Sequence, residues 1–438
     1  MINKEELLVL IHEFLEQTQK KEWKPGIDLV QYSGNIFDST EYVAAISSLL
    51  TGWLGLNTAG YKFEHAFPKL LGKNFGSLTN SGSSANLLML SALTSKRSFG
   101  LKPGAKVLVA ASGFPTTVNP VIQLGFKPIF VDIELDTLNL NLDLVEDTLK
   151  NDPEITVMMF AHALGNPPDM DRVMQLVDKY GLIFLEDCCD ALGSEYDGNL
   201  LGSYGYLSSC SFYPAHHMTI GEGGFIASNN RETDKIIKSF RDWGRGCYCN
   251  GKASLCATGT CNKRFSNWMP ELPNEVFDHK YIYNEIGYNL KPIELQAAIG
   301  LEQIKKLDEF KIKRISNHSR LYNIFEKYSE YFILPKATEK SNPNWFAFVL
   351  TVKDGAPFNR TKFCAFLETN KIQTRPYFAG NLLLQPAYSS MFEAIGAKEK
   401  YPMATKSTTD TFFLGCSPII TDEQLDWVEE VVNKFFKQ

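Results

Sequence analysis

Two apolar runs, Ile155-Thr156-Val157-Met158-Met159-Phe160 and Leu182-Ile183-Phe184-Leu185-Glu186-Asp187, decide the fold class of this 438-residue chain. Each run is short and almost wholly apolar, which is typical of a strand buried on both faces of a sheet. Between them, Pro168–Tyr180 carries apolar residues at three- and four-residue spacing, the pattern of an amphipathic helix. The order strand, helix, strand predicts parallel strands joined by a crossover helix.

The same alternation extends over residues 75–230. Apolar runs recur at Lys106–Ala111 and Pro128–Asp132, with a helical segment at Leu142–Lys150. The expected fold is therefore α/β, with a mostly parallel central sheet, flanking helices and a site at the carboxyl ends of the strands. A helix is expected from Pro292 to about Phe325. The expected domains are an N-terminal helical segment (1–65) packing on the small domain, a large cofactor-binding domain (66–300) with a Cys-rich insertion (245–285), and a small C-terminal α/β domain (301–438).

Composition and charge exclude several classes of protein. Hydrophobic residues make up 44% of the chain and charged residues 21%, as in ordinary globular proteins, and the net charge is −6. A net negative chain lacks the basic field that binds a phosphate backbone, so no nucleic-acid partner is expected. No stretch approaches the roughly 20 apolar residues of a membrane helix, and the amino end does not resemble a signal peptide. We therefore expect a cytoplasmic protein with no membrane partner.

A glycine turn precedes an apolar helix at Thr79-Asn80-Ser81-Gly82-Ser83-Ser84-Ala85-Asn86. Backbone N–H groups and hydroxyls at a helix N-terminus favour an anion, most often a phosphate. The alternative is a capped helix that binds no ligand.

Other motifs end strands with groups that suit a cofactor. Phe114 follows one strand, His162 a second, and the carboxylate of Asp187 ends a third. A fourth strand passes into Ser211-Phe212-Tyr213-Pro214-Ala215-His216 and then a glycine-rich turn. Phosphate site, aromatic ring and carboxylate should therefore converge on one edge of the sheet.

The order of these motifs resembles the sugar-nucleotide aminotransferase branch of the pyridoxal-phosphate enzymes with the aspartate aminotransferase fold (fold type I). In that branch the sixth residue counted from Ser211 is the lysine that binds the cofactor covalently; here it is His216. Imidazole has no primary amine, so His216 is expected to act as an acid and base, with pyridoxamine 5′-phosphate bound noncovalently. A lone histidine could instead be structural.

The cysteines point to a metal. Of nine cysteines, four lie within fifteen residues, namely Cys247, Cys249, Cys256 and Cys261. In a reducing compartment such a cluster favours metal ligation, and the residue types alone leave structural zinc open.

The histidine and the cysteines together closely resemble the CDP-4-keto-6-deoxy-D-glucose 3-dehydrase family of 3,6-dideoxyhexose biosynthesis. Cys189 precedes Cys247 by fifty-seven intervening residues, followed by Cys-x-Cys and a fourth cysteine. The resemblance covers nearly the whole chain, through Gly113–Pro120, Glu186–Ser194, Phe240–Arg245, Asp278–Tyr281 and Phe378–Asn381. It implies a 2Fe-2S cluster on Cys189, Cys247, Cys249 and Cys261; Cys261 is chosen over Cys256 because Asn262-Lys263-Arg264-Phe265 matches the family context.

The resemblance also implies roles for residues around the cofactor. Gly82, Ser83 and Ser211 would hold its phosphate, and Phe114 would stack on its ring. Asp187 would face the ring nitrogen, and His162 and Asp190 would lie near the polar edge. Asn289 would reach the phosphate of a neighbouring subunit, which implies a homodimer. On charge grounds, Arg241, Arg375 and Tyr377 are candidates for the nucleotide diphosphate.

The activity implied is dehydration and deoxygenation at C3 of CDP-4-keto-6-deoxyglucose, leading to a lipopolysaccharide O-antigen sugar. The two electrons would come from an NAD(P)H-dependent iron–sulfur flavoprotein reductase. Two alternatives remain open at this point. One is a cluster-free enzyme resembling GDP-4-keto-6-deoxy-D-mannose 3-dehydratase, and the other is a non-catalytic protein of the same fold with structural zinc.

Overall fold

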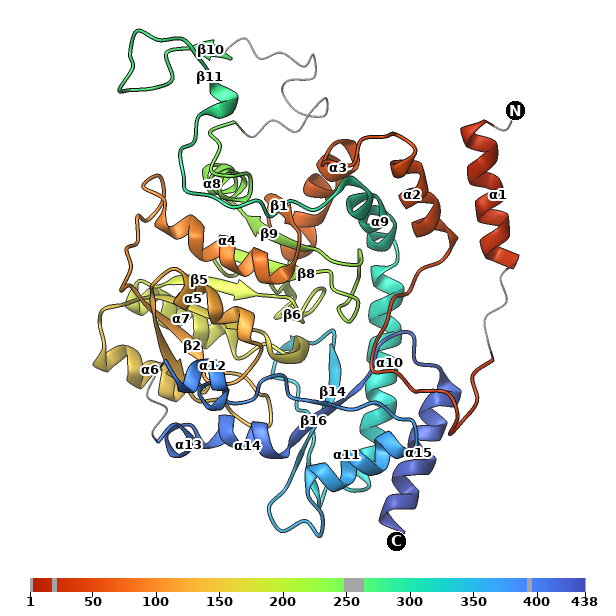
Figure 1. The fold of residues 1–438 in the computed structure, drawn as a ribbon. Helices are drawn as coiled ribbons and strands as arrows, with labels where there is room; N and C mark the ends of the chain where they lie inside the picture. The colour runs from red at the N-terminus through yellow and green to blue at the C-terminus, as the bar shows by residue number, and fades with distance from the viewer. Residues whose placement is uncertain (1–2, 18–21, 248–263, 392–395, 438) are drawn as a thin grey trace.

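A seven-stranded sheet forms the centre of the computed structural model, which describes residues 3–17, 22–247, 264–391 and 396–437 (Figure 1). Its strand order is β1-β9-β8-β5-β4-β2-β3. Every strand except β9 runs in the same direction, because only β9 pairs antiparallel to its neighbours. The strands are β1 (Phe75–Thr79), β2 (Lys106–Ala110), β3 (Lys127–Val131), β4 (Ile155–Ala161), β5 (Ile183–Asp187), β8 (Leu207–Ser211) and β9 (Gly224–Ser228).

Helices cover both faces of this sheet, as the apolar runs predict. Val157 and Met159 of β4 pack in one hydrophobic cluster with α4, α5 and α8, whereas Met158 packs in the other with α3, α6, α7 and α9. Successive strand residues point to opposite faces, so a strand buried on both must be apolar throughout. These helices are α3 (Thr58–Ala66), α4 (Gly82–Thr94), α5 (Asn119–Gln123), α6 (Leu142–Asn151), α7 (Met170–Tyr180), α8 (Arg231–Arg241) and α9 (Glu294–Ile304). The predicted α/β fold with a mostly parallel sheet is confirmed.

A smaller domain follows α9 and has its own antiparallel sheet, in the order β12-β14-β16-β15. Its core is rich in aromatic rings, among them Phe325, Phe332, Phe348 and Phe363. The helix expected from Pro292 to Phe325 is two helices, because the chain turns at Lys305 and Lys306. The elements are α10 (Leu307–Glu326), β12 (Phe332–Ile333), β14 (Ala347–Val352), α11 (Arg360–Thr369), β15 (Arg375–Pro376), α12 (Pro386–Ser389), α13 (Ala397–Lys400), α14 (Pro402–Asp410), β16 (Thr411–Gly415) and α15 (Asp422–Phe436).

The amino-terminal helices pack mainly on the large domain, contrary to the prediction for residues 1–65. Helix α1 (Lys4–Gln17) contacts α2 (Ser39–Leu49), and α2 and α3 both pack on α9. The connecting segment reaches the small domain, where Val30 joins the hydrophobic core and forms a backbone bridge with Ile372. The helical periodicity was sufficient to predict α1 and α2 but not the surface that they cover.

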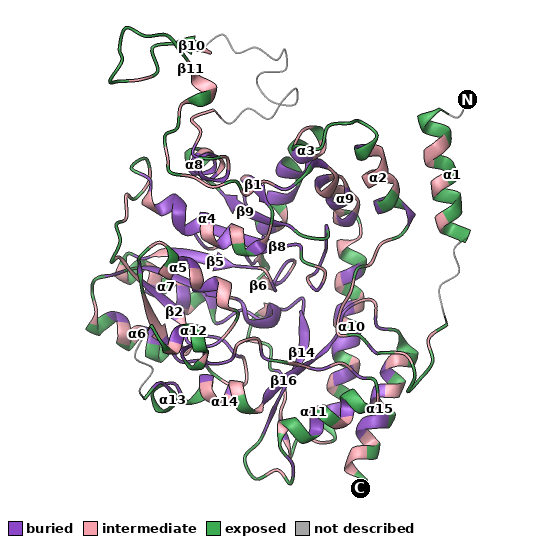
Figure 2. Cartoon of the chain, in the orientation of Figure 1, coloured by how far each residue is buried: buried purple, intermediate pink, exposed green. Residues whose placement is uncertain are grey.

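An exposed arm projects from the large domain beyond α8 (Figures 1 and 2). It carries β10 (Phe265–Ser266) and β11 (Phe277–Asp278), which form a two-stranded sheet. The predicted ligands Cys249 and Cys261 lie outside the described residues. Elsewhere, β13 (Ser341–Asn342), β6 (Glu195–Tyr196) and β7 (Asn199–Leu200) form a small sheet. In the described ranges no helix has the length and apolar character to span a bilayer.

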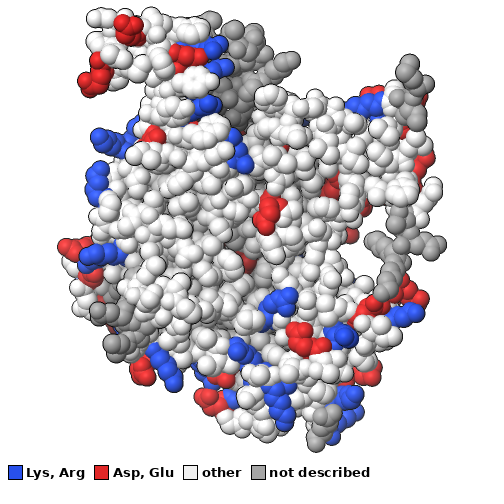
Figure 3. Space-filling view, in the orientation of Figure 1, with Lys and Arg blue, Asp and Glu red and all other residues white. Residues whose placement is uncertain are grey.

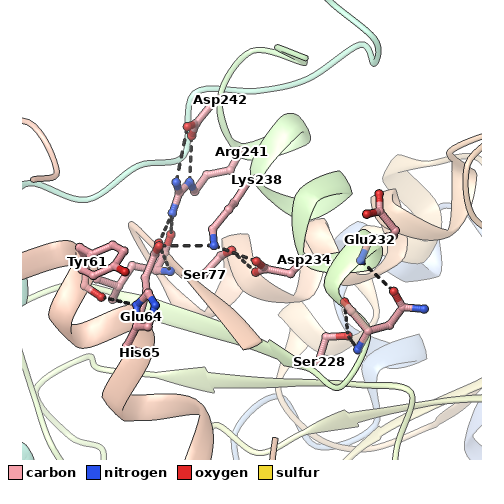
Figure 4. Close-up of polar contacts among 12 residues, drawn as sticks. Tyr61, Glu64, His65, Ser77, Ser228, Glu232, Asp234, Lys238, Arg241 and Asp242 are labelled. Carbon is pink, nitrogen blue, oxygen red and sulfur yellow. Dashed lines mark hydrogen bonds and ion pairs between the residues drawn. The ribbon is translucent and has the colours of Figure 1, made fainter. Parts of the chain in front are cut away.

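Buried charges anchor β1 just before the glycine turn (Figure 4). The guanidinium of Arg241 is fully buried and donates from Nη1 to Glu64 Oε1 at 2.6 Å and to the Leu78 carbonyl at 2.9 Å. Its Nε donates to Asp242 at 2.8 Å, and Lys238 lies 3.6 Å from Glu64. The prediction that Arg241 binds the diphosphate is therefore wrong, because its donor groups bind Glu64, the Leu78 carbonyl and Asp242 in the protein interior.

The contribution of this network can be tested with Glu64→Gln. Although burial opposes ionisation, Lys238 and Arg241 hold the pKa of Glu64 below its usual range. Loss of the charge leaves a buried guanidinium short of a partner, so we expect the free energy of unfolding at pH 7 to fall by about 3 kcal/mol. Denaturant unfolding measures this change.

The pH dependence and a control make this test specific. A lowered folded-state pKa stabilises the fold above the unfolded pKa of about 4.3, so the difference between wild type and Glu64→Gln should shrink as the pH falls below that value. The control is Glu232→Gln, which removes an exposed carboxylate that pairs with Lys235 on α8. It should change the free energy of unfolding by less than about 1 kcal/mol. Equal effects of the two substitutions would contradict the anchoring role.

Candidate active site

A cavity of about 1130 Å³ lies at the edge of the sheet where the parallel strands end. Its lining comes from the large domain, from the small domain and from the segment around Tyr32. Nine of the predicted site residues line it: Gly82, Ser83, Phe114, Asp187, Cys189, Asp190, Ser211, His216 and Arg375. The convergence expected from the strand-end motifs is thus present.

The amino end of α4 forms one wall, with Ser81, Gly82 and Ser83 facing Ser211 at the end of β8. Ser81 caps the helix by accepting a hydrogen bond from the Ser84 N–H at 3.1 Å. A Cβ atom placed on Gly82 would lie 2.5 Å from Ser211 Cβ. Glycine therefore keeps the backbone and the serines open to a bound group, and a helix N-terminus with hydroxyls around it suits a phosphate.

Asp187, the last residue of β5, lies in the floor of the cavity and is 3% exposed. Its Oδ2 accepts hydrogen bonds from Asn86 Nδ2 at 2.7 Å and Thr117 Oγ1 at 2.8 Å, and its Oδ1 accepts one from the Cys189 N–H at 3.1 Å. Ser209 Oγ donates a longer hydrogen bond to Oδ1 at 3.4 Å, and together these donors fix the plane of the carboxylate. A fixed, buried carboxylate is a strong partner for a protonated ring nitrogen.

An aromatic ring also lines the cavity. Phe114 follows β2 and is 50% exposed, so a ring face is open to stacking. Phe378 of the small domain supports it edge-on, with centroids 5.7 Å apart and planes at 89°. Phe378 itself has φ 44°, which is uncommon for a bulky residue and is characteristic of ligand-binding segments.

His216 reaches the cavity from the turn after β8. Its Nδ1 lies 3.4 Å from Asp190 Oδ1, and the two side chains are 15% and 11% exposed. Burial raises the pKa of Asp190, and the neighbouring imidazole partly offsets this effect. An imidazole beside a carboxylate is an arrangement that general acid–base catalysis uses.

Two predicted residues lie behind the cavity wall. The ring of His162 is fully buried and its Nε2 lies 3.1 Å from Glu186 Oε1, so the expected place of His162 at the cofactor's edge is wrong. Tyr377 is buried against a separate cavity of about 40 Å³ and does not line the main one. The strand-end position of His162 was correct, but the direction of its side chain was not, and the buried Tyr377 is not placed to bind a diphosphate in the main cavity.

Asn289 and Cys247 also lie off the cavity lining. Asn289 accepts a hydrogen bond from Lys291 Nζ at 2.9 Å and forms a backbone bridge with Asp242. Its expected contact with a second subunit stays a prediction. Cys247 is half-buried at the base of the arm.

Other cavity residues were missed by the sequence analysis because they come from remote segments. Tyr32 lies against Arg375, whose guanidinium carbon is 4.5 Å from the tyrosine ring centroid. Phe346, Phe413 and Tyr388 come from the small domain. None belongs to a strand-end motif, and only the packing of the two domains brings them together.

The sequence matches the DegT/DnrJ/EryC1/StrS aminotransferase family over residues 36–435. The chain belongs to this family. It is 42% identical to the lipopolysaccharide biosynthesis protein RfbH of Salmonella typhimurium, covering 96% of this chain and 95% of that protein. It is 37% identical to dTDP-4-dehydro-2,6-dideoxy-D-glucose 3-dehydratase of Saccharopolyspora spinosa, over 99% of this chain and 92% of that protein. The structure of E. coli GDP-4-keto-6-deoxy-D-mannose-3-dehydratase with bound hydrated PLP superimposes with a TM-score of 0.77 at 25% identity, covering 92% and 99%.

The fold is that of the pyridoxal-phosphate-dependent aminotransferases, and the cavity fits that cofactor. The space between Gly82 and Ser211, here called the phosphate cradle, would be filled by a Cβ on Gly82 and suits the phosphate. The fixed carboxylate of Asp187 suits the ring nitrogen, and Phe114 suits the ring face. On the face shown in Figure 3, charges of both signs are dispersed among the described residues, with no continuous field of Lys and Arg.

The phosphate cradle can be tested with Gly82→Ala. Because the new Cβ would collide with Ser211 Cβ, we expect the affinity for pyridoxamine phosphate to fall about tenfold or more, equivalent to about 1.4 kcal/mol. Titration followed by cofactor absorbance measures this. Gly55→Ala is the matched control, since its Cβ would meet no atom closer than 3.4 Å. Unchanged affinity in Gly82→Ala would place the phosphate elsewhere.

Proposed function

We propose that this protein is a nucleotide-sugar 3-dehydratase that uses pyridoxamine 5′-phosphate to remove the C3 hydroxyl of a 4-keto-6-deoxyhexose. The observation that carries the proposal is the imidazole of His216, which lines the cavity with Asp187, Phe114 and the Gly82 cradle. Aminotransferase chemistry requires a cavity amine that bonds to the cofactor. A histidine at this place favours proton transfer without that bond.

The substrate we propose is CDP-4-keto-6-deoxyglucose, on a route to a 3,6-dideoxyhexose of lipopolysaccharide O-antigen. The names of two relatives, a lipopolysaccharide biosynthesis protein and a 3-dehydratase of a nucleotide-linked deoxysugar, support this class of substrate. The cytidine base rests on the family resemblance. Arg375 at the cavity wall is the remaining candidate for the diphosphate.

When bound, pyridoxamine phosphate supplies an amine for the C4 ketone and a ring that accepts electrons. Asp187 keeps the ring nitrogen protonated through its fixed carboxylate. His216 takes a proton at the cofactor's C4′ carbon and donates one to the departing C3 oxygen, which leaves as water. Asp190 faces Nδ1 of the imidazole and orients the ring for these two transfers.

We further propose that Cys189, Cys247, Cys249 and Cys261 hold a 2Fe-2S cluster, with Cys256 as the alternative fourth ligand. Their spacing supports this set, and Cys189 lies in the cavity wall next to Asp187. Net deoxygenation needs two electrons, and a cluster of this type transfers them singly. The donor would be an NAD(P)H-dependent iron–sulfur flavoprotein reductase. We also propose a homodimer in which Asn289 contacts the cofactor that is bound to the partner subunit.

A cluster-free 3-dehydratase is the second candidate. The whole-chain likeness to E. coli GDP-4-keto-6-deoxy-D-mannose-3-dehydratase favours it. Such an enzyme would regenerate the amine with glutamate and would need no electron donor. The two candidates therefore differ in whether turnover depends on an external reductant or on glutamate.

His216→Asn tests the proposed base. Removing the imidazole should leave pyridoxamine phosphate affinity within about twofold, while C3 deoxygenation falls by about a hundredfold or more. Turnover is measured anaerobically with CDP-4-keto-6-deoxyglucose and a chemical one-electron donor. His65→Asn, on the exposed side of α3, should behave as wild type. Near-normal turnover of His216→Asn would show that the base lies elsewhere.

Anaerobic purification tests the cluster. We expect a brown protein with iron and acid-labile sulfide in equal amounts, and Cys247→Ser should lose most of both because it removes a thiolate ligand. Cys364→Ser is the control, since Cys364 lies on α11 in the small domain. A colourless wild-type protein that contains zinc would overturn the redox half of the proposal, and glutamate-dependent turnover without iron would support the cluster-free candidate.

A further inference from the structure

The backbone at His216 is held by a buried arginine from the other domain. Arg314 of α10 is 1% exposed, and its Nη2 donates a hydrogen bond to the His216 carbonyl at 2.9 Å. Because this contact is made to the peptide group of His216, it fixes the backbone position from which the imidazole extends. None of the strand-end motifs pointed to Arg314, because it lies about one hundred residues further along the chain.

The same guanidinium binds the segment that enters β14. Its Nη1 donates to the Phe346 carbonyl at 3.1 Å and to the Trp345 carbonyl at 3.4 Å. Phe346 in turn packs against the imidazole of His216, with ring centroids 5.4 Å apart. One side chain therefore fixes both the carbonyl behind His216 and the ring beside it.

Neighbouring hydrogen bonds connect the same segment to the loop that carries Asp190. His217 Nε2 donates to the Asn344 carbonyl at 2.8 Å, and Asn344 Nδ2 donates to the Leu192 carbonyl at 2.8 Å. Residues 344–346 thus touch both the turn that carries His216 and the loop that carries Asp190. These are the two groups whose separation of 3.4 Å sets the acid–base pair.

Core packing alone does not account for an arginine at this position. The carboxylate of Asp190 and the thiol of Cys416 act electrostatically on Arg314, but within the described ranges no carboxylate lies in ion-pair distance of its guanidinium, and its Nε has no hydrogen-bond partner. Burying a cation without a carboxylate paired directly to it is costly, whereas an apolar side chain of similar volume would fill the space without that cost. The planar fork of the guanidinium can, however, bind two carbonyl groups on different segments at once.

We propose that Arg314 is a positioning residue for catalysis, which orients His216 toward the reacting atoms and ties that orientation to the small domain. The inference rests on the proposed role of His216. A proton-transfer group works only within a narrow range of positions, so a small displacement of its backbone is enough to slow the reaction. The amino end of α4 around Gly82 and the ring of Phe114, which lie on other segments, would be left in place.

Arg314→Lys is the test, because lysine keeps the charge but cannot bind both carbonyl groups in the same fork. We expect kcat to fall about tenfold or more, while KM and pyridoxamine phosphate affinity stay within about twofold. Arg360→Lys is the matched control: Arg360 also donates to main-chain carbonyls, those of Thr408 and Thr411, but in the small domain and off the cavity lining. Its kinetics should match wild type.

A second readout does not depend on turnover. In protein labelled with ¹⁵N-histidine and free of cofactor, the His216 signals, assigned by their absence in His216→Asn, should shift or broaden in Arg314→Lys and stay unchanged in Arg360→Lys. Arg314→Gln, which keeps a single donor group, should show the same change. Melting temperatures confirm that each variant is folded at the assay temperature.

The inference is overturned if the folded Arg314 variants keep wild-type kcat and His216 signals, or if kcat and cofactor affinity fall together. It is also overturned if neither variant folds, since Arg314 would then serve the core. These results differ from a failure of the proposed function, in which wild-type protein would not deoxygenate the nucleotide sugar. In that case the His216 signals still show whether Arg314 sets the position of the imidazole.

Discussion

The buried carboxylate of Asp187 is the interaction around which the cavity is organised. Asn86 of α4, Thr117 after β2 and the Cys189 N–H all donate to it, so three segments meet at the end of β5. A carboxylate removed from water must be satisfied by such donors. The same hydrogen bonds that make its burial tolerable therefore fix the distance between the α4 cradle and the floor of the cavity.

The position of His216 beside Asp190 depends on a different constraint, the packing of the small domain against the large one. His216 and Asp190 belong to the large domain, yet Phe346 and Arg314 from beyond α9 hold the turn that carries the histidine. The turn that carries His216 is thus positioned by contacts across the domain boundary, whereas the donors to Asp187 all lie in the large domain.

Strand-end motifs predicted much of the cavity because the geometry of a parallel sheet leaves little freedom. Buried strands that run in one direction bring their following loops to one edge, so Gly82, Phe114, Asp187, Ser211 and His216 had to lie near one another. The motif position did not reveal the direction of each side chain. His162 ends its strand as expected, but its ring points into the core toward Glu186, and Arg241 is held by Glu64 inside the protein.

The sequence by itself determined the fold class and the edge of the sheet at which the site lies, because local hydrophobic pattern and motif order carry that information. Tertiary structure alone decided which distant residues complete the cavity. Tyr32, Phe346 and Arg314 have no local signal, since their roles arise only when two domains with separate cores pack together. Contacts between segments far apart along the chain depend on that packing, which no short stretch of residues encodes.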